Sequence, residues 1–318
     1  MHWRDAGPDD APNAALALSV DTRRPGLVVE ASRSRRLRIV AGQRTYLWAR
    51  VEEGSYGAWV LRSKSLEPIA IVDPIRADEA RARSSISEWT RWFARALERS
   101  ERSPLRTGDW QLTRLRRNLS THSSDAFAPE DNHRMPSPAF ALKNALELPQ
   151  CHYIDWGCSG SGEIIPLREP SPADAARVKA WRKHARENTL PPVLLWWVTG
   201  LEAYVILDGH DRLRAAQLEG VDPALITLWQ PREVEVRANE ELRRHFVAAY
   251  EQVFENDALS DAARKKLNTQ LVDHPRERWR TVMTTSRAND GLDAVWDDEV
   301  ARETQGDDEA REDMLFDG

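Results

Sequence analysis

The sequence predicts an α+β fold, with a β-rich N-terminal domain, a small mixed α/β domain and a helical C-terminal extension. Three observations indicate this arrangement. Short runs of alternating apolar residues, separated by Gly-containing turns, fill residues 15–74. A pattern typical of one amphipathic helix follows at 78–99, and the stretch 193–229 has the pattern of strand, turn, strand, helix and strand. A chain of 318 residues is long enough for two domains.

The β-rich domain is expected to span residues 1–100 and to be closed by the helix at its C-terminal end. Gly42 is expected in a hairpin turn, because it separates two runs with alternating apolar residues. A linker or long loop is expected at 101–150, since Ser, Pro, Asp and Asn gather at 121–138. The apolar residues of the helix at 78–99 recur three and four positions apart: Ile86, Trp89, Trp92, Phe93 and Leu97.

The mixed α/β domain is expected to span residues 151–232. Its buried strands are continuous apolar runs, as expected for strands covered on both faces. Ser171 and Pro172 are typical of a helix start, and Gly220 is typical of a helix end. The expected elements are strands at 163–167, 193–198, 203–207 and 224–229, with helices from 171 and over 208–218.

The C-terminal part is expected to be helical over residues 233–304, with helices at 239–254, 260–271 and 279–300. An acidic disordered tail is expected at 305–318. Ten acidic residues and two arginines lie between Asp297 and the C-terminus, which gives this segment a formal charge of −8. Dense charge of one sign with few apolar side chains disfavours packing.

Composition excludes several classes of protein. The formal net charge of −6 makes a general nucleic-acid binder unlikely, because such proteins carry a broad basic excess. Two cysteines cannot form a disulfide framework, which favours a reducing compartment. The apolar run 14–18 is too short for a signal peptide, and the run 193–198 is too short to span a membrane. We therefore expect a cytoplasmic protein with no membrane association.

One motif carries the expected chemistry. Asp208, Gly209, His210, Asp211 and Arg212 lie where a predicted strand ends and a helix begins. The first turn of a helix presents unpaired N–H groups and a partial positive charge, which favours phosphate binding. Glycine allows a ligand to approach the backbone, and an arginine can donate two parallel hydrogen bonds to a phosphate. The predicted nucleotide- or phosphate-binding residues are Gly209, His210, Asp211 and Arg212.

The residues alone leave the role of the motif open. Asp208 can be a helix N-cap, a Mg²⁺ ligand or an acceptor for a substrate hydroxyl, and His210 can transfer a proton near neutral pH. In a purely structural interpretation, Asp208 caps the helix and Arg212 pairs with Glu219 or another acid. A metal site at Cys151, His152 and Cys158 is a weaker alternative, because four zinc ligands at a recognised spacing are absent from the sequence.

The segment 164–229 resembles the ParB/sulfiredoxin-like superfamily. The matching pieces are IIPLREPSPADAARV, PPVLLWW, AYVILDGHDRLRAAQLEG and ALITLW. The resemblance implies a small ParB-like domain whose helix start binds the phosphates of a nucleotide. In the sulfiredoxin branch a reactive cysteine occupies the position of His210, so this chain departs from that chemistry. The Asp-Gly-His-His-Arg branch, which includes free-serine kinase, is the most similar, with Asp211 in place of its second histidine.

The resemblance also implies catalytic residues and cofactors. In the kinase branch a carboxylate before the first helix of the domain activates the substrate hydroxyl. Glu169 matches that region, and Asp174 is an alternative. We expect Asp208, His210 and Glu169 to be catalytic, Asp208 to bind Mg²⁺, and the nucleotide to be ATP, ADP or CTP. The expected activity is Mg²⁺-dependent phosphotransfer or nucleoside triphosphate hydrolysis.

Two other functions remain open from the sequence. One is a non-catalytic interaction or immunity-type protein with a degenerate site and a protein partner, which the acidic C-terminus and the abundant tryptophans favour. The other is a DNA-associated ParB-like protein or nuclease, against which the acidic balance counts.

Overall fold

The computed structural model describes residues 1–5, 14–52, 57–64, 70–115, 145–156, 163–235, 278–282, 284 and 286–315. The chain forms two compact units, one of residues 1–230 with 282–318 and the other of residues 231–281. The second unit contributes strand β13 (Pro231–Glu235) and most of β14 (Arg278–Val282), which pair with each other. Helices and mixed sheets together make this an α+β protein, as predicted.

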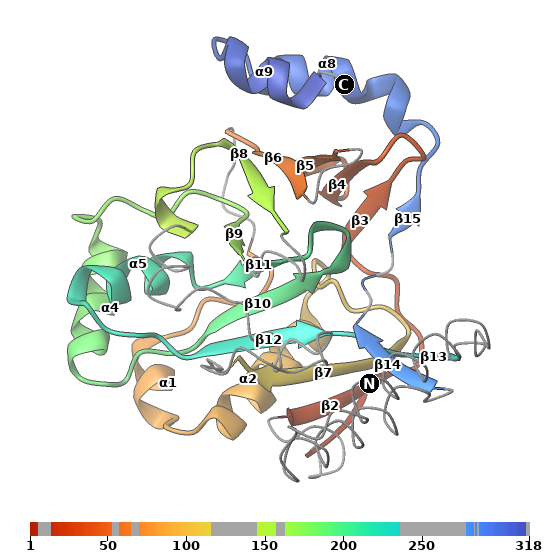
Figure 1. Cartoon of the computed structure of the whole chain (residues 1–318). Coiled ribbons are helices and arrows are strands. Elements are labelled where there is room, and N and C mark those ends of the chain that lie inside the picture. The colour runs from red at the N-terminus through yellow and green to blue at the C-terminus, as the bar shows by residue number, and fades with distance from the viewer. Residues whose placement is uncertain are drawn as a thin grey trace, which may run out of the picture. The chain divides into compact units, whose positions relative to one another are not determined.

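The larger unit contains a seven-stranded sheet with the order β1-β2-β7-β12-β10-β11-β9. The predicted strand–turn–strand–helix–strand arrangement is present. β10 pairs antiparallel with β11 and parallel with β12, and α5 (His210–Glu219) connects β11 to β12 (Figure 1). The strands are β1 (His2–Arg4), β2 (Ala14–Val20), β7 (Gly108–Arg114), β9 (Ile164–Pro166), β10 (Val193–Val198), β11 (Ala203–Asp208) and β12 (Leu225–Trp229).

A six-stranded sheet with the order β15-β3-β4-β5-β6-β8 completes the strands of this unit. The predicted hairpin at Gly42 joins β4 to β5, and Gly42 adopts the left-handed backbone conformation (φ +61°) that a tight turn requires. The strands are β3 (Leu27–Ala31), β4 (Arg36–Ala41), β5 (Arg44–Val51), β6 (Gly57–Arg62), β8 (Cys151–Asp155) and β15 (Arg287–Ala288).

The two sheets do not follow the predicted domain boundaries. β7 lies in the segment 101–150, expected to be a linker, yet it pairs with both β2 and β12 in the seven-stranded sheet. β8 belongs to the predicted segment 151–232 but pairs with β6. Each sheet therefore contains strands from both sides of the expected linker, and residues 1–100 and 151–230 are parts of one unit.

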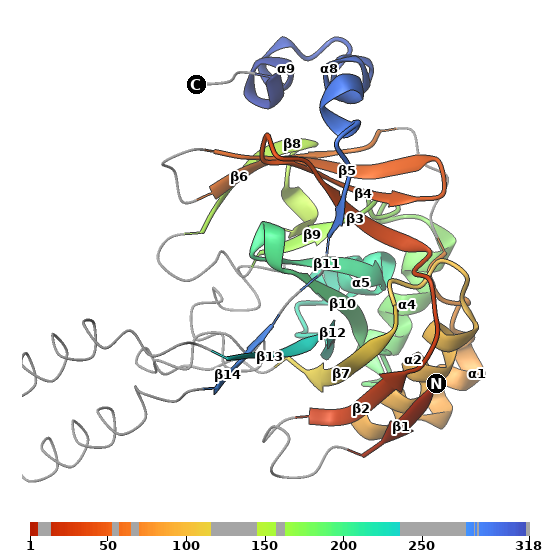
Figure 2. The ribbon, with the colours of Figure 1, turned by 90° about the vertical axis from the view of Figure 1, so that its right-hand side faces the viewer.

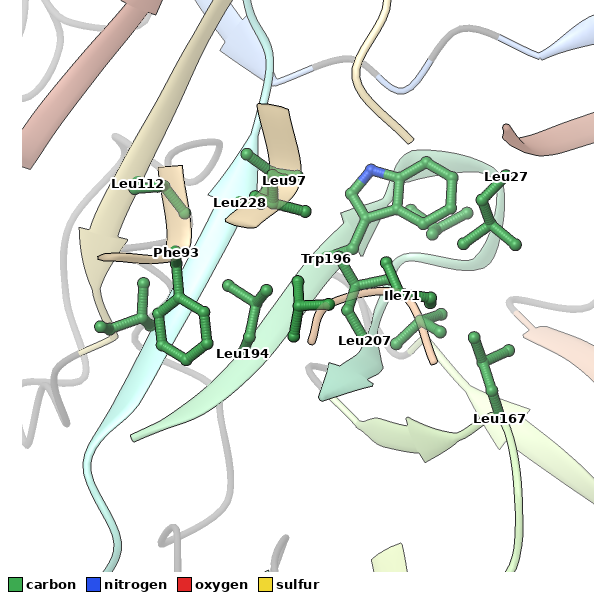
Figure 3. Packing of buried hydrophobic residues seen from close by; sticks show 14 of the residues in the cluster. Leu27, Ile71, Phe93, Leu97, Leu112, Leu167, Leu194, Trp196, Leu207 and Leu228 are labelled. Atoms are coloured by element: carbon green, nitrogen blue, oxygen red, sulfur yellow. The ribbon is translucent and has the colours of Figure 1, made fainter. Parts of the chain in front are cut away.

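A continuous hydrophobic core joins the sheets. The strands at the centre of the seven-stranded sheet are buried on both faces, as their unbroken apolar sequence predicted: Leu194 and Trp196 belong to one cluster, and Leu195 and Trp197 to the opposite one. The first cluster also includes residues of the six-stranded sheet and of α2. Figure 3 shows the packing of this cluster and labels Leu27, Ile71, Phe93, Leu97, Leu112, Leu167, Leu194, Trp196, Leu207 and Leu228.

The predicted helix at 78–99 is two helices, α1 (Ala77–Ala82) and α2 (Ile86–Arg99). Ser85 separates them and caps α2, since its hydroxyl accepts a hydrogen bond from the Glu88 N–H while the Glu88 carboxylate accepts one from the Ser85 N–H. Helix α4 (Ala176–Arg186) begins five residues after the predicted start at Ser171. The buried face of α2 is as predicted, with Trp89, Trp92, Phe93 and Leu97 in the core.

The C-terminal segment corrects two predictions. α9 (Asp308–Leu315) occupies most of the tail expected to be disordered, and it packs with α8 (Leu292–Glu303) on the six-stranded sheet. Figures 1 and 2 show both helices on the side of this sheet away from the seven-stranded sheet. Within the stretch expected to be helical at 279–300, residues 279–282 belong to β14 instead. The helices expected at 239–254 and 260–271 lie outside the described residues.

Candidate functional site

The predicted motif lies at the turn from β11 into α5. Asp208 is the last residue of β11, and α5 begins at His210. Gly209 has a φ of +108°, a conformation that other residues rarely adopt. A Cβ atom at this position would lie 2.9 Å from Arg212 Nη2 and 3.2 Å from Val193 Cα. The glycine is therefore required by the close packing of the turn.

Arg212 is held in place by contacts of one guanidinium nitrogen, while its Nε has no hydrogen-bond partner among the described residues. Its side chain is 1% exposed, and its Nη2 donates hydrogen bonds to Asp208 Oδ2 (2.6 Å) and to the Pro192 carbonyl oxygen (2.8 Å). The guanidinium also lies over the Trp181 ring of α4, 5.8 Å from the ring centroid. The partner of Arg212 is Asp208, whereas Glu219 pairs with Arg182 and Arg186 of α4. Arg212 thus ties α5 to β11 and to α4.

Asp208 faces Arg212 and does not cap the helix. The N-cap position is Gly209, and no side chain caps this helix. In the part of the chain that the structure describes, no group of three or more His, Cys, Asp or Glu residues is placed to hold a metal ion. Mg²⁺ binding by Asp208 therefore stays a prediction, and the ion pair with a buried arginine is the role that the geometry supports.

Asp211 connects α5 to the segment between β9 and α4. Its Oδ1 accepts a hydrogen bond from the Ser171 N–H (2.9 Å), and its Oδ2 lies 3.1 Å from Arg168 Nη2 and 3.4 Å from Arg177 Nε. Burial alone would raise the pKa of Asp211, but the Ser171 hydrogen bond and the Arg168 charge outweigh it, so the pKa is lowered. Asp211 is therefore an ionised anchor for two arginines.

His210 is a buried residue of the motif whose hydrogen bonding is incomplete. It is 3% exposed, and its Nε2 has no hydrogen-bond partner among the described residues. Burial lowers its pKa well below the ordinary 6.5, and the positive charge of Arg168 lowers it further. The imidazole is therefore neutral at neutral pH, with one nitrogen able to donate and the other able to accept.

Glu169 lies near the motif through Arg168, which donates hydrogen bonds to the Glu169 carbonyl oxygen (2.8 Å) and to Asp211 Oδ2 (3.1 Å). The Glu169 side chain is 81% exposed, and its Oε1 is 3.3 Å from Arg62 Nη2. Sequence reasoning missed Arg62, Arg168 and Arg177. Arg62 lies more than a hundred residues before the motif, and the only signal for it in the sequence is a charged residue that directly follows the apolar run of β6.

The assembled cluster favours an anion over a cation. Four arginines and three carboxylates form three separate sets of ion pairs near His210: Arg62 with Glu169, Arg168 and Arg177 with Asp211, and Arg212 with Asp208. With neutral histidine the formal charge of these residues is +1. Arginine-rich surroundings of this kind suit phosphate or carboxylate groups.

Comparison with known proteins adds no assignment: no family model, no curated protein and no solved structure matches this chain. The described part of the chain also contains no helix of the length and apolarity needed to cross a membrane. The resemblance of the segment 164–229 to the ParB/sulfiredoxin-like superfamily therefore stays a prediction.

Proposed function

We propose that the chain binds a phosphate-bearing ligand, with a nucleotide as the leading candidate, at the start of α5. The observation that carries the proposal is His210, a buried neutral imidazole with an unpartnered Nε2 beside several arginines. An unsatisfied buried polar atom is unfavourable unless a ligand or water completes its hydrogen bonding. A phosphate oxygen is a suitable acceptor for a histidine N–H next to guanidinium groups.

The nucleotide is favoured over other phosphate compounds by the sequence motif. The ParB-like resemblance supports binding of ATP, ADP or CTP phosphates at this helix start. The role of the individual residues changes from the sequence-based expectation, however. Arg168 and Arg177 are candidates for ligand contact because their side chains are 15% and 50% exposed. Arg212, in contrast, is buried and forms an ion pair with Asp208.

Binding without catalysis is the form of this function that the ion pairs favour. Asp208, Asp211 and Glu169 are each paired with an arginine. A carboxylate that is engaged in an ion pair is less available to accept a proton from a substrate hydroxyl. Mg²⁺-dependent phosphotransfer or hydrolysis is the second candidate, favoured by the high exposure of Glu169, which leaves that carboxylate open to a substrate hydroxyl.

The test compares two arginines of the same helix. Arg177 and Arg186 are 50% and 56% exposed, both lie on α4, and each pairs with a carboxylate of α5. Titration calorimetry with ATP, ADP, CTP and GTP, each with and without Mg²⁺, would measure affinity. Arg177→Ala should weaken binding about three- to tenfold through loss of a partly exposed charge-assisted contact, and Arg186→Ala should leave it unchanged.

Two outcomes would contradict the proposal. The first is that none of the four nucleotides binds to the wild-type protein. The second is that Arg177→Ala and Arg186→Ala reduce affinity equally, since this would show a general charge effect. Turnover of a bound nucleotide that requires Mg²⁺ and is lost in Glu169→Gln would support the catalytic candidate instead.

A further inference from the structure

A second polar cluster lies on the inner face of the six-stranded sheet. His152 of β8 pairs with Val60 of β6, and Arg62 is two residues further along β6. Residues two apart on a strand share a face, so Arg62 and His152 lie on the same face as Val60, whose side chain is in the core between the sheets. Arg62 and His152 are 6% and 8% exposed. Two polar side chains are therefore buried as diagonal neighbours in an otherwise apolar face.

Arg62 is poorly satisfied for a buried cation. A guanidinium has five N–H donors, and among the described residues its side chain donates one hydrogen bond, to the exposed carboxylate of Glu169 at 3.3 Å. Burial lowers the pKa of Arg62, and Glu169 opposes that effect only in part. A buried charge with one long ion pair is unfavourable unless another anion approaches it.

The two histidines near Arg62 supply further donors. His152 Nε2 and His210 Nε2 both lack a hydrogen-bond partner in the described part of the chain. Burial lowers the pKa of His152 to about 4, against a hydrogen bond to the Pro149 backbone that raises it, and the Arg62 charge lowers it further. Both rings are neutral at neutral pH and can each donate one N–H. Glu163 is the acid nearest His152, with 3.8 Å between Oε2 and Nε2.

Contacts connect Arg62 to the turn at His210. Arg62 pairs with Glu169, and Arg168 donates both to the Glu169 carbonyl oxygen (2.8 Å) and to Asp211 (3.1 Å), the residue after His210.

We propose that Arg62, His152 and His210 form a subsite for a phosphate group where β6 and β8 approach the start of α5. The Glu169 carboxylate pairs with the Arg62 guanidinium, and a bound phosphate displaces the carboxylate from it. Glu169 can leave readily because its side chain is exposed and its ion pair is long. The subsite makes the six-stranded sheet, which lies outside the ParB-like segment, part of the binding site.

The chemical class of the ligand rests on the proposed function. Arg177→Ala is expected to weaken binding, whereas removal of the Glu169 charge is expected to strengthen it. Removing an internal competitor should tighten binding. Glu169→Gln should therefore increase affinity for inorganic phosphate or for a nucleotide about threefold or more. Arg62→Gln should reduce affinity about tenfold or more, through loss of a charge-assisted hydrogen bond.

Glu187→Gln is the matched control. It removes the same charge from another arginine–glutamate pair, in which Arg81 Nη2 and Glu187 Oε2 are 3.4 Å apart. Calorimetry with inorganic phosphate and with ATP, on the full chain, would separate free phosphate from the phosphate of a nucleotide as the source. Thermal melts would show whether the Arg62→Gln variant folds. If that variant does not fold, Glu169→Gln still tests the subsite.

The outcomes are distinct. Tighter binding of phosphate or ATP by Glu169→Gln but not by Glu187→Gln supports the subsite, including the case in which only the variant binds. Unchanged or weaker binding by Glu169→Gln overturns it, while the comparison of Arg177→Ala with Arg186→Ala still decides the proposed function. Absence of binding to the wild type and to Glu169→Gln overturns both.

Discussion

Glu30 is a buried charge that is held by several partners. Glu30 of β3 is 2% exposed and accepts hydrogen bonds from Arg38 Nε (2.8 Å), Asn289 Nδ2 (2.7 Å) and Arg287. Burial alone would raise the pKa of Glu30, but these donors outweigh it and the pKa is lowered. The result is an ionised carboxylate that connects β3 and β4 to the segment before α8. Glu163 is different, because burial dominates there and raises its pKa to about 7.

The raised pKa of Glu163 predicts a pH dependence of stability. Between its ordinary pKa of 4.5 and about 7, the folded state holds a proton that the unfolded state has released, so this residue's contribution falls as pH rises through that window. The amide of the Glu163→Gln variant does not titrate in this pH range, so its stability lacks this pH dependence. The variant should gain stability relative to wild type between pH 5 and pH 8, by up to about 3 kcal/mol.

Urea unfolding of both proteins at several pH values would measure this trend. Glu202→Gln offers an independent replicate, since burial also raises the pKa of Glu202 to about 7. A stability difference between wild type and Glu163→Gln that stays constant from pH 5 to pH 8 would show that Glu163 is ionised throughout and would contradict the prediction.

At the scale of residues, the sequence predicted the position of the candidate motif in the fold better than the contacts that its residues make. The turn from β11 to α5 was predicted because a strand end, a glycine and a helix start are local signals. The pairing of Arg212 with Asp208 is also local, four residues apart, but the sequence could not exclude a phosphate as its partner. Arg62 could not be predicted as a neighbour of His210, because their proximity arises from the packing of two sheets.

Among the elements, α9 is the clearest departure from expectation. The charge density of the tail predicted disorder, yet Ala310 and Met314 lie one helical turn apart and are both buried. Met314 belongs to a small cluster with Trp48, Leu61 and Trp296. The surface on which α9 packs thus comes from β5, β6 and α8. The strands β5 and β6 lie about 250 residues before α9 in the sequence. Pattern analysis of the tail alone could not find that surface.

We predict that Met314→Ala destabilises the protein by about 2–4 kcal/mol, because it leaves a cavity at a fully buried position. Glu309→Ala is the control on the same helix, since Glu309 is exposed and its removal should change stability by less than about 0.5 kcal/mol. Chemical unfolding would measure both. Equal stability of the two variants would show that α9 does not pack on the six-stranded sheet in solution.

For the whole molecule, the two sheets make the predicted domains interdependent. Composition predicted a break at 101–150 because turn-forming residues gather at 121–138, but it did not detect β7, whose Trp110 and Leu112 alternate toward the core. The order of strands in a sheet is set by long-range pairing, which short-range patterns do not contain. The α+β class, by contrast, was predictable from local periodicity alone.

This interdependence predicts that a polypeptide of residues 151–232 will not fold on its own. It would lack β7, so β12 would present an unpaired edge, and it would lack β6, the partner of β8. The apolar face that includes Leu194 and Trp196 would also lose the residues of α2 and of the six-stranded sheet that cover it. We expect no cooperative thermal transition and strong binding of a hydrophobic dye, in contrast to the full chain. A sharp transition with dispersed amide resonances in the isolated polypeptide would show instead that residues 151–232 form an autonomous domain.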